Sequence, residues 1–349
     1  MIKSLTSLRG VFILFIFFHH CLNLYPGGGT MGVTFFFVLG GFSMTLGYKD
    51  KVMQTDFSFK SYLTRRFIKF YPLHWLCLLA AMPLAFASFN ISKLPVFLAN
   101  VALLQTWVPI KDFYFSFNWV SWYLADTVFF AIMFPLIFKW IVKSGVMWQT
   151  LIALLMASVY TLLVVKLPTE QYHAILYISP YVRLSDFVYG IYLALLYGSL
   201  KEASAKWWNG KTAGQIIVFV LIVLLVVESC LLSEETRLIA PVYWLLIGAV
   251  ILTASLINKP DGGGYFVLEN QYLHRLGELS FEIFMIHQII IRYSKSSFAK
   301  SLYLDNDILF VCFTLVLTIV LSIVAERYVL KSINQWLKKR SQQSMTARS

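Results

Sequence analysis

Residues 8–24 read LRGVFILFIFFHHCLNL, and this stretch decides how the chain folds. Apart from Arg9 and the pair His19 and His20, it is almost wholly apolar. About 17–25 such residues are needed to cross the hydrocarbon core of a bilayer. No small-residue cleavage site follows the run, so we interpret it as a retained spanning helix and not as a signal peptide.

The whole chain has the composition of a membrane protein. Of its 349 residues, 59% are hydrophobic and 13% are charged, whereas soluble domains are roughly 45–50% apolar and about 25% charged. The net charge of +12 could indicate nucleic-acid binding. However, Lys and Arg cluster in short loops between apolar runs, which is the pattern that orients membrane proteins. We therefore expect contact with membrane lipid and no nucleic acid.

Working outward from the first stretch, apolar runs predict an all-α, polytopic transmembrane helix bundle of about ten spans. The predicted spans are 8–24, 31–48, 72–90, 119–138, 147–165, 181–199, 212–232, 239–257, 276–291 and 308–325. A shorter apolar run at 94–108 is interrupted by Pro95. We expect it to be interfacial or re-entrant, and an eleventh span is the alternative.

The distribution of basic residues predicts the topology. With a cytoplasmic N-terminus, the cytoplasmic segments carry 21 Lys and Arg residues and the outer segments carry 7. This excess favours cytoplasmic N- and C-termini. We divide the chain into a membrane-embedded domain, 1–330, and a short basic cytoplasmic tail, 331–349. The four cysteines, which have neither metal-ligand nor disulfide-framework spacing, give no reason to expect a metal.

Arg9 and His20 share one face of the first predicted helix. Eleven residues turn the helix about 20° past three full turns, with the Cα atoms roughly 16 Å apart. His19 lies about 80° off that face, so the geometry favours His20. The pair could be ordinary interfacial anchors. Alternatively, a histidine that takes a proton near neutral pH suits general-base work on a hydroxyl.

A basic cluster precedes the third span, in RRFIKFYPLHW at 65–75. Arg66 and Lys69 are three residues apart and share a face if the segment is helical. Together with Arg65 they could bind anionic lipid, the common role of such clusters beside a membrane. They could equally bind the phosphates of a cytosolic cofactor.

Four further polar side chains fall inside predicted spans, where ionisable groups are costly and usually functional. They are Asp126, Arg183, Glu282 and His287. Arg183 lies three residues before Asp186, so a structural ion pair is as good an interpretation as a ligand site. For His287, a packing or hydrogen-bonding role competes with catalysis.

Taken in order, these segments resemble acyltransferase family 3, membrane O-acyltransferases that typically acetylate sugars of bacterial surface polysaccharides. The resemblance runs from residue 5 to about 330. The segments that carry it are Arg9-x10-His20, GVTFFFVLGGF at 32–42, Arg66-x-x-Lys69 followed by Tyr71-Pro72, Trp122-Tyr123-Leu124 with Pro135, Arg183 with Phe187 and Gly190, LGELSFEIFMIH at 276–287, and Glu326-Arg327.

The sequence departs from the family pattern at three positions. Thr127 stands where the family often carries a glutamate, and Asp126 is one residue early, which rotates its side chain by about 100°. Gly40 stands where serine is common. Lys69 replaces an arginine, keeping the charge but losing bidentate phosphate recognition.

The resemblance implies transfer of an acyl group, acetyl by default, from an acyl-coenzyme A to a hydroxyl of a carbohydrate. In this interpretation Arg65, Arg66 and Lys69 bind the donor phosphates. His20 is the general base or carries the acyl group, and Arg9 orients the donor or stabilises developing negative charge. A separate partner could complete the transfer outside the membrane, which we expect to be a bacterial plasma (inner) membrane.

Two other classes compete with this interpretation. A glycan transporter or flippase would line a pathway with the same polar groups, but it often shows inverted repeats, and none is visible here. A glycan polymerase usually carries a large outer loop, whereas the longest outer loop predicted here is only 91–118. Binding of coenzyme A would discriminate the enzyme from both.

Overall fold

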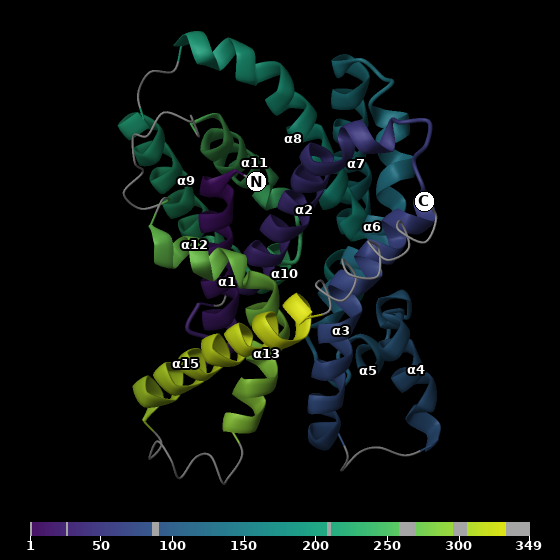
Figure 1. Cartoon of the computed structure of the whole chain (residues 1–349), viewed down its shortest axis with the longest axis vertical. Helices are drawn as coiled ribbons and strands as arrows, with labels where there is room; N and C mark the ends of the chain where they lie inside the picture. Colours follow the sequence, from purple (N-terminus) through teal and green to yellow (C-terminus); the bar gives the residue numbers. More distant parts are fainter. Residues whose placement is uncertain are drawn as a thin grey trace, which may run out of the picture.

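The computed structural model describes residues 2–25, 27–85, 91–207, 211–257, 268, 270–295 and 306–332. Within these residues the chain is helical and contains no β-strand, which confirms the all-α expectation. The longer helices are α1 (Lys3–His20), α2 (Gly28–Val52), α3 (Phe59–Ala85), α6 (Ser121–Ile141), α7 (Val146–Lys166), α8 (Pro180–Trp207), α9 (Lys211–Leu231), α11 (Pro241–Leu256), α13 (Ser280–Ser294) and α15 (Asp307–Ala325). The shorter ones are α4 (Leu94–Ala102), α5 (Lys111–Tyr114), α10 (Glu234–Arg237) and α12 (Gln271–Glu278), with single turns in between (Figure 1).

Each of the ten predicted spans overlaps one of the ten longer helices. Six helices among the described residues are long and apolar enough to cross a membrane: α2, α3, α6, α7, α9 and α15. The protein is therefore a multi-pass membrane protein. The count of ten and the orientation of the termini stay predictions, and most of the basic tail lies outside the described residues.

The third predicted span is extended at its N-terminal end in the structure. Helix α3 begins at Phe59, well before the start at residue 72 that hydropathy predicts. The added turns carry the basic cluster, which a search for apolar runs leaves out. Helix α3 continues through Pro72, so Arg66 and Lys69 lie on the same helix as the spanning segment.

The apolar run at 94–108 forms no continuous helix. Helix α4 has nine residues, about 14 Å of rise, which is too short for a core about 30 Å thick. Leu103, which caps its C-terminal end, has a left-handed φ of 57°, and a single turn, Gln105–Trp107, follows. These lengths favour the interfacial or re-entrant interpretation over an eleventh span.

Helices α2 and α8 cross at the centre of the bundle with their backbones close together. A Cβ added at Gly41 would lie 1.9 Å from the carbonyl oxygen of Phe187, and one added at Gly190 would lie 1.9 Å from that of Val38. Such approaches are open only to glycine, as at small-residue interfaces of membrane helices. Gly41 therefore belongs to the packing face between α2 and α8.

Helix α12 packs along α1 in the same way. A Cβ added at Gly277 would lie 1.7 Å from the carbonyl oxygen of Thr6. The neighbouring Arg275 donates to Glu326 through Nη2 at 2.5 Å and through Nη1 at 3.2 Å. This bidentate ion pair ties α12 to the segment Glu326–Leu330 that follows α15, so α1, α12 and α15 are joined at one level of the bundle.

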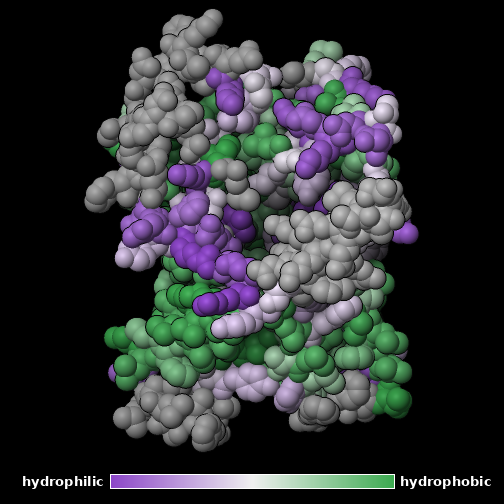
Figure 2. Space-filling view, viewed as in Figure 1, coloured by the Kyte–Doolittle hydropathy of each residue, from purple (hydrophilic) through white to green (hydrophobic). Residues whose placement is uncertain are grey.

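The outer surfaces of several helices are apolar. Leu155 of α7 is 63% exposed, Phe219 of α9 is 66% exposed and Val316 of α15 is 60% exposed. Figure 2 shows an apolar belt across the lower part of one face, below a more hydrophilic region. In a bilayer these faces contact lipid chains, so exposure here costs nothing.

Candidate active site

A cavity of about 200 Å³ lies where α1, α2, α3, α6 and α13 meet. Its polar lining includes Arg9 of α1, Ser43 of α2, and Arg66 and Lys69 of α3. The apolar lining comprises Phe36, Leu39, Met44, Phe70, Tyr123, Leu124, Phe281 and Phe284. The structure thus brings the arginine of the first span and the basic cluster of the third, more than fifty residues apart, to one cavity.

Arg66 is held against two aromatic rings. Its guanidinium carbon lies 4.4 Å from the ring centroid of Tyr48 and 5.2 Å from that of Tyr62. The hydroxyl of Tyr62 donates to the carbonyl oxygen of Ala131 at 2.7 Å, which fixes that ring. The Nε and Nη2 atoms of Arg66 make no hydrogen bond within the described part of the chain. The guanidinium is therefore positioned with donors available for an anion.

The other two members of the basic cluster differ in position. Lys69 lines the cavity beside Arg66. Arg65 is exposed, donates to the hydroxyl of Ser61 at 2.9 Å and is absent from the cavity lining. Glu282 is 5% exposed and lies near Arg9 and Lys69.

The position of the family's glutamate faces the cavity, and Asp126 does not. Thr127 lines the cavity and donates to the carbonyl oxygen of Tyr123 at 2.8 Å. Asp126 is fully buried and does not line the cavity. One residue of helix rotates a side chain by about 100°, so Asp126 does not supply the missing carboxylate to the cavity.

His20 is the last residue of α1, about 16 Å along the helix axis from Arg9. Its Nδ1 atom is 3.1 Å from Nε2 of His287 and 3.0 Å from the carbonyl oxygen of Ile16. The ring of Phe284, which lines the cavity, lies 5.8 Å from the ring of His287. Arg9 therefore lines the cavity, whereas His20 lies outside its lining, beyond the rings of Phe284 and His287.

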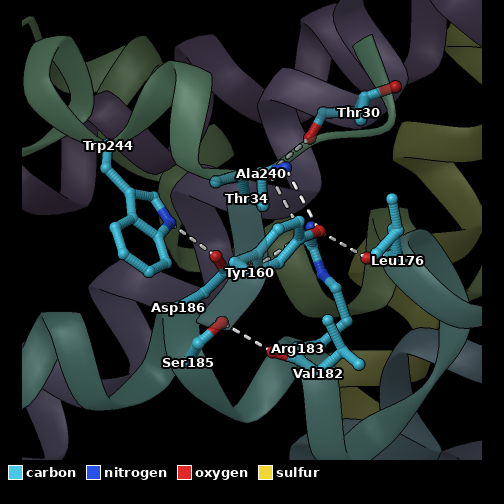
Figure 3. Close-up of polar contacts among 10 residues, drawn as sticks. All are labelled: Thr30, Thr34, Tyr160, Leu176, Val182, Arg183, Ser185, Asp186, Ala240 and Trp244. Carbon is cyan, nitrogen blue, oxygen red and sulfur yellow. Dashed lines mark hydrogen bonds and ion pairs between the residues drawn. The ribbon is translucent and has the colours of Figure 1, made fainter. Parts of the chain in front are cut away.

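Arg183 and Asp186 form a fully buried ion pair within α8, with Nη2 and Oδ2 3.0 Å apart. Arg183 also donates to the hydroxyl of Thr34 at 3.1 Å, and the indole of Trp244 donates to Asp186 at 2.6 Å. Figure 3 shows these contacts, with Tyr160 beside them. The pair links α8 to α2 and α11, which supports the interpretation of Arg183 as a structural ion pair.

Sequence reasoning missed the aromatic supports of the site. Tyr62 precedes Arg66 by one helical turn, and that spacing could have predicted the stacking. Tyr48 belongs to α2 and Phe284 to α13, so only the fold brings them to the cavity. No local signal in either segment predicts such a contact.

Comparison with known proteins identifies the family. The family described as an acyltransferase domain matches residues 2–327, and the chain belongs to it. It is therefore an acyltransferase built into a multi-pass membrane protein. This assignment favours the acyltransferase over the flippase and polymerase classes.

Several relatives carry names of the same kind. The acyltransferase MdmB of Streptomyces mycarofaciens is 27% identical over 76% of this chain and 69% of its own length. A protein of Acidianus two-tailed virus, named as an acetyltransferase, is 25% identical over 82% of each chain. A protein of Staphylococcus aureus, named as an O-acetyltransferase, is 25% identical over 94% of this chain, which spans 56% of that protein. No solved structure matches.

Proposed function

We propose that this protein transfers an acyl group, acetyl by default, from acyl-coenzyme A to a hydroxyl of a carbohydrate at a bacterial plasma membrane. The observation that carries the proposal is the cavity lined by Arg9, Arg66 and Lys69. Family membership supplies the reaction class. The cavity adds a cationic site of the kind that a phosphorylated donor needs.

The donor would enter with its phosphates at Arg66 and Lys69. A guanidinium recognises phosphate through paired hydrogen bonds, whereas an ammonium acts as a point charge. The aromatic contacts of Arg66 reduce the conformational freedom lost on binding. With a cytoplasmic N-terminus, the N-terminal half of α1, which carries Arg9, lies toward the cytoplasm, where coenzyme A is found. Arg65 does not line the cavity, so it would contribute only to the positive electrostatic potential around it.

The acyl end of the donor would extend along the apolar wall toward His20. There Nε2 of His20 would take the proton of the acceptor hydroxyl. At the same time the hydroxyl oxygen would attack the thioester carbonyl carbon. A carbon–oxygen bond forms, the carbon–sulfur bond breaks, and the leaving thiolate takes the proton from the imidazolium. Arg9, about 16 Å from His20 along the helix, would orient the donor and would not stabilise charge at the reacting carbon.

Some relatives are named O-acetyltransferases, which supports a hydroxyl acceptor. That the hydroxyl belongs to a carbohydrate is part of our proposal. The acceptor would approach from the side of the membrane at which His20 lies. A separate protein could complete the transfer on the outer side.

The test is mass spectrometry of surface glycans from cells with the gene and from cells without it. We expect one acyl mass increment, 42 Da for acetyl, to be lost with the gene and to return on complementation. Identical glycan spectra from both strains would contradict a glycan acceptor, while thioester turnover by the purified protein would still test the donor.

A further inference from the structure

The contacts between His20 and His287 fix which nitrogen of each ring carries the proton. Nδ1 of His287 lies 2.7 Å from the carbonyl oxygen of Phe284 and 3.0 Å from that of Ile283. Carbonyl oxygens only accept hydrogen bonds, so Nδ1 must be the protonated nitrogen. In a neutral imidazole the other nitrogen, Nε2, then holds a lone pair.

The same reasoning carries over to His20. Its Nδ1 atom faces two acceptors, the lone pair of His287 at 3.1 Å and the carbonyl oxygen of Ile16 at 3.0 Å. Nδ1 of His20 must therefore be its donor, which leaves the lone pair on Nε2. Because the hydrogen bond at one ring nitrogen sets the state of the other, His287 and the Ile16 carbonyl together hold His20 in this tautomer.

We infer that His287 is a positioning residue that holds His20 in the tautomer with Nε2 unprotonated, the form that can act as a base. The inference deepens the proposed function and rests on it for its catalytic meaning. The histidine-to-histidine contact itself stands on geometry alone. His287 is fully buried in α13, so it is set to act through His20 and not on a substrate.

The pair also bears on the charged form of His20. Once Nε2 takes the hydroxyl proton, Nδ1 of the imidazolium still donates to Nε2 of His287 and to the carbonyl oxygen of Ile16. Hydrogen bonds to a charged group contribute about twice as much as neutral ones. His287 would thus stabilise the imidazolium more than the neutral base, which lowers the barrier to proton transfer.

Two substitutions of His287 separate this role from packing. In His287→Gln the side-chain amide oxygen can lie near the place of Nε2 and accept from His20. In His287→Asn the shorter side chain reaches only the place of Nδ1, so the acceptor is lost. We expect His287→Asn to reduce kcat by about 10- to 100-fold, the loss expected for a hydrogen bond to a charged group, with the donor KM unchanged. His287→Gln should recover most of that loss.

A nitrogen-15 NMR measurement reads the tautomer without any turnover. With histidine-labelled protein in lipid nanodiscs, the His20 signals are identified by their loss in His20→Gln. We expect a protonated Nδ1 and an unprotonated Nε2 in the wild type, and a shift toward the Nε2-protonated form in His287→Asn.

The outcomes distinguish this inference from the proposed function. An Nε2-protonated His20 in the wild type would overturn the inference, as would equal loss of kcat in the Gln and Asn variants. Full turnover by His20→Gln would instead overturn the role of His20 as base, and the observed tautomer would stand.

Discussion

Replacing Arg66 should weaken donor binding far more than replacing its neighbour Arg65. Arg66 lines the cavity and stacks on Tyr48 and Tyr62, whereas Arg65 is exposed and outside the lining. A hydrogen bond to a charged group contributes about 1.5–3 kcal/mol. At about 1.4 kcal/mol per tenfold change, Arg66→Ala should raise the Kd for coenzyme A by about 10- to 140-fold.

The assay is titration calorimetry of purified protein in nanodiscs with coenzyme A and, separately, with dephospho-coenzyme A. Arg65→Ala is the matched control, because it removes the same charge from the next residue of the same helix. We expect its Kd to change by less than about threefold, as for an exposed charge. Arg66→Lys should fall between the two, since it keeps the charge and loses the paired donors.

Equal losses of coenzyme A affinity in Arg65→Ala and Arg66→Ala would show that Arg66 has no special role in binding the donor. That result would mean that the cluster acts through its overall field, as a lipid-binding patch does, and that the cavity plays no part. Raising the salt concentration would then abolish binding in the wild type and in both variants alike.

Two further predictions concern the framework of the site. Gly41→Ser should strongly reduce the yield of folded protein, because its Cβ would lie 1.9 Å from the Phe187 carbonyl oxygen. Gly40→Ser should fold normally, since its Cβ would meet only ring carbons of Phe187 at 3.8 and 3.9 Å. Size-exclusion profiles and thermal shift measure both variants, and equal behaviour would contradict close packing at Gly41. Arg183→Leu should destabilise the protein by about 3–5 kcal/mol, because it leaves Asp186 buried without its cation. Adding Asp186→Leu should recover part of that loss. Wild-type thermal stability of Arg183→Leu would show that the ion pair has no structural role.

The fold could be predicted from sequence wherever a local signal sets the structure. The apolar runs gave every long helix, because burial in lipid demands continuous hydrogen-bonded helix. The start of α3 was missed because its first turns are basic and amphipathic. The number of spans stays a prediction, since α11 and α13 have only 16 and 15 residues.

The site could be predicted only in part. The placement of Arg9 beside Arg66 and Lys69 needs the packing of α1 against other helices, which no local pattern reports. The separation of Arg9 from His20 did follow from helix geometry alone. The contact between His20 and His287 joins residues 267 positions apart, and nothing in either segment predicts it.

Asp126 shows why a near match in sequence need not be a match in space. It lies one residue from Thr127, yet it is fully buried outside the cavity lining while Thr127 faces the cavity. A rotation of about 100° per residue decides between the two environments. A hydroxyl therefore faces the cavity at the position where the resemblance places a glutamate.

The central claim is that His20 is the base in a coenzyme A-dependent acyl transfer. The most direct test compares thioester consumption by purified His20→Gln and His19→Gln in nanodiscs with labelled acetyl-coenzyme A and a carbohydrate acceptor. His19 packs against Gly29 of α2 and its ring lies edge-on to that of His20, with centroids 4.9 Å apart, so it is the matched control for a neighbouring imidazole. His20→Gln should bind coenzyme A normally and lose turnover, while His19→Gln should retain turnover; wild-type turnover by His20→Gln would show that His20 is not the base.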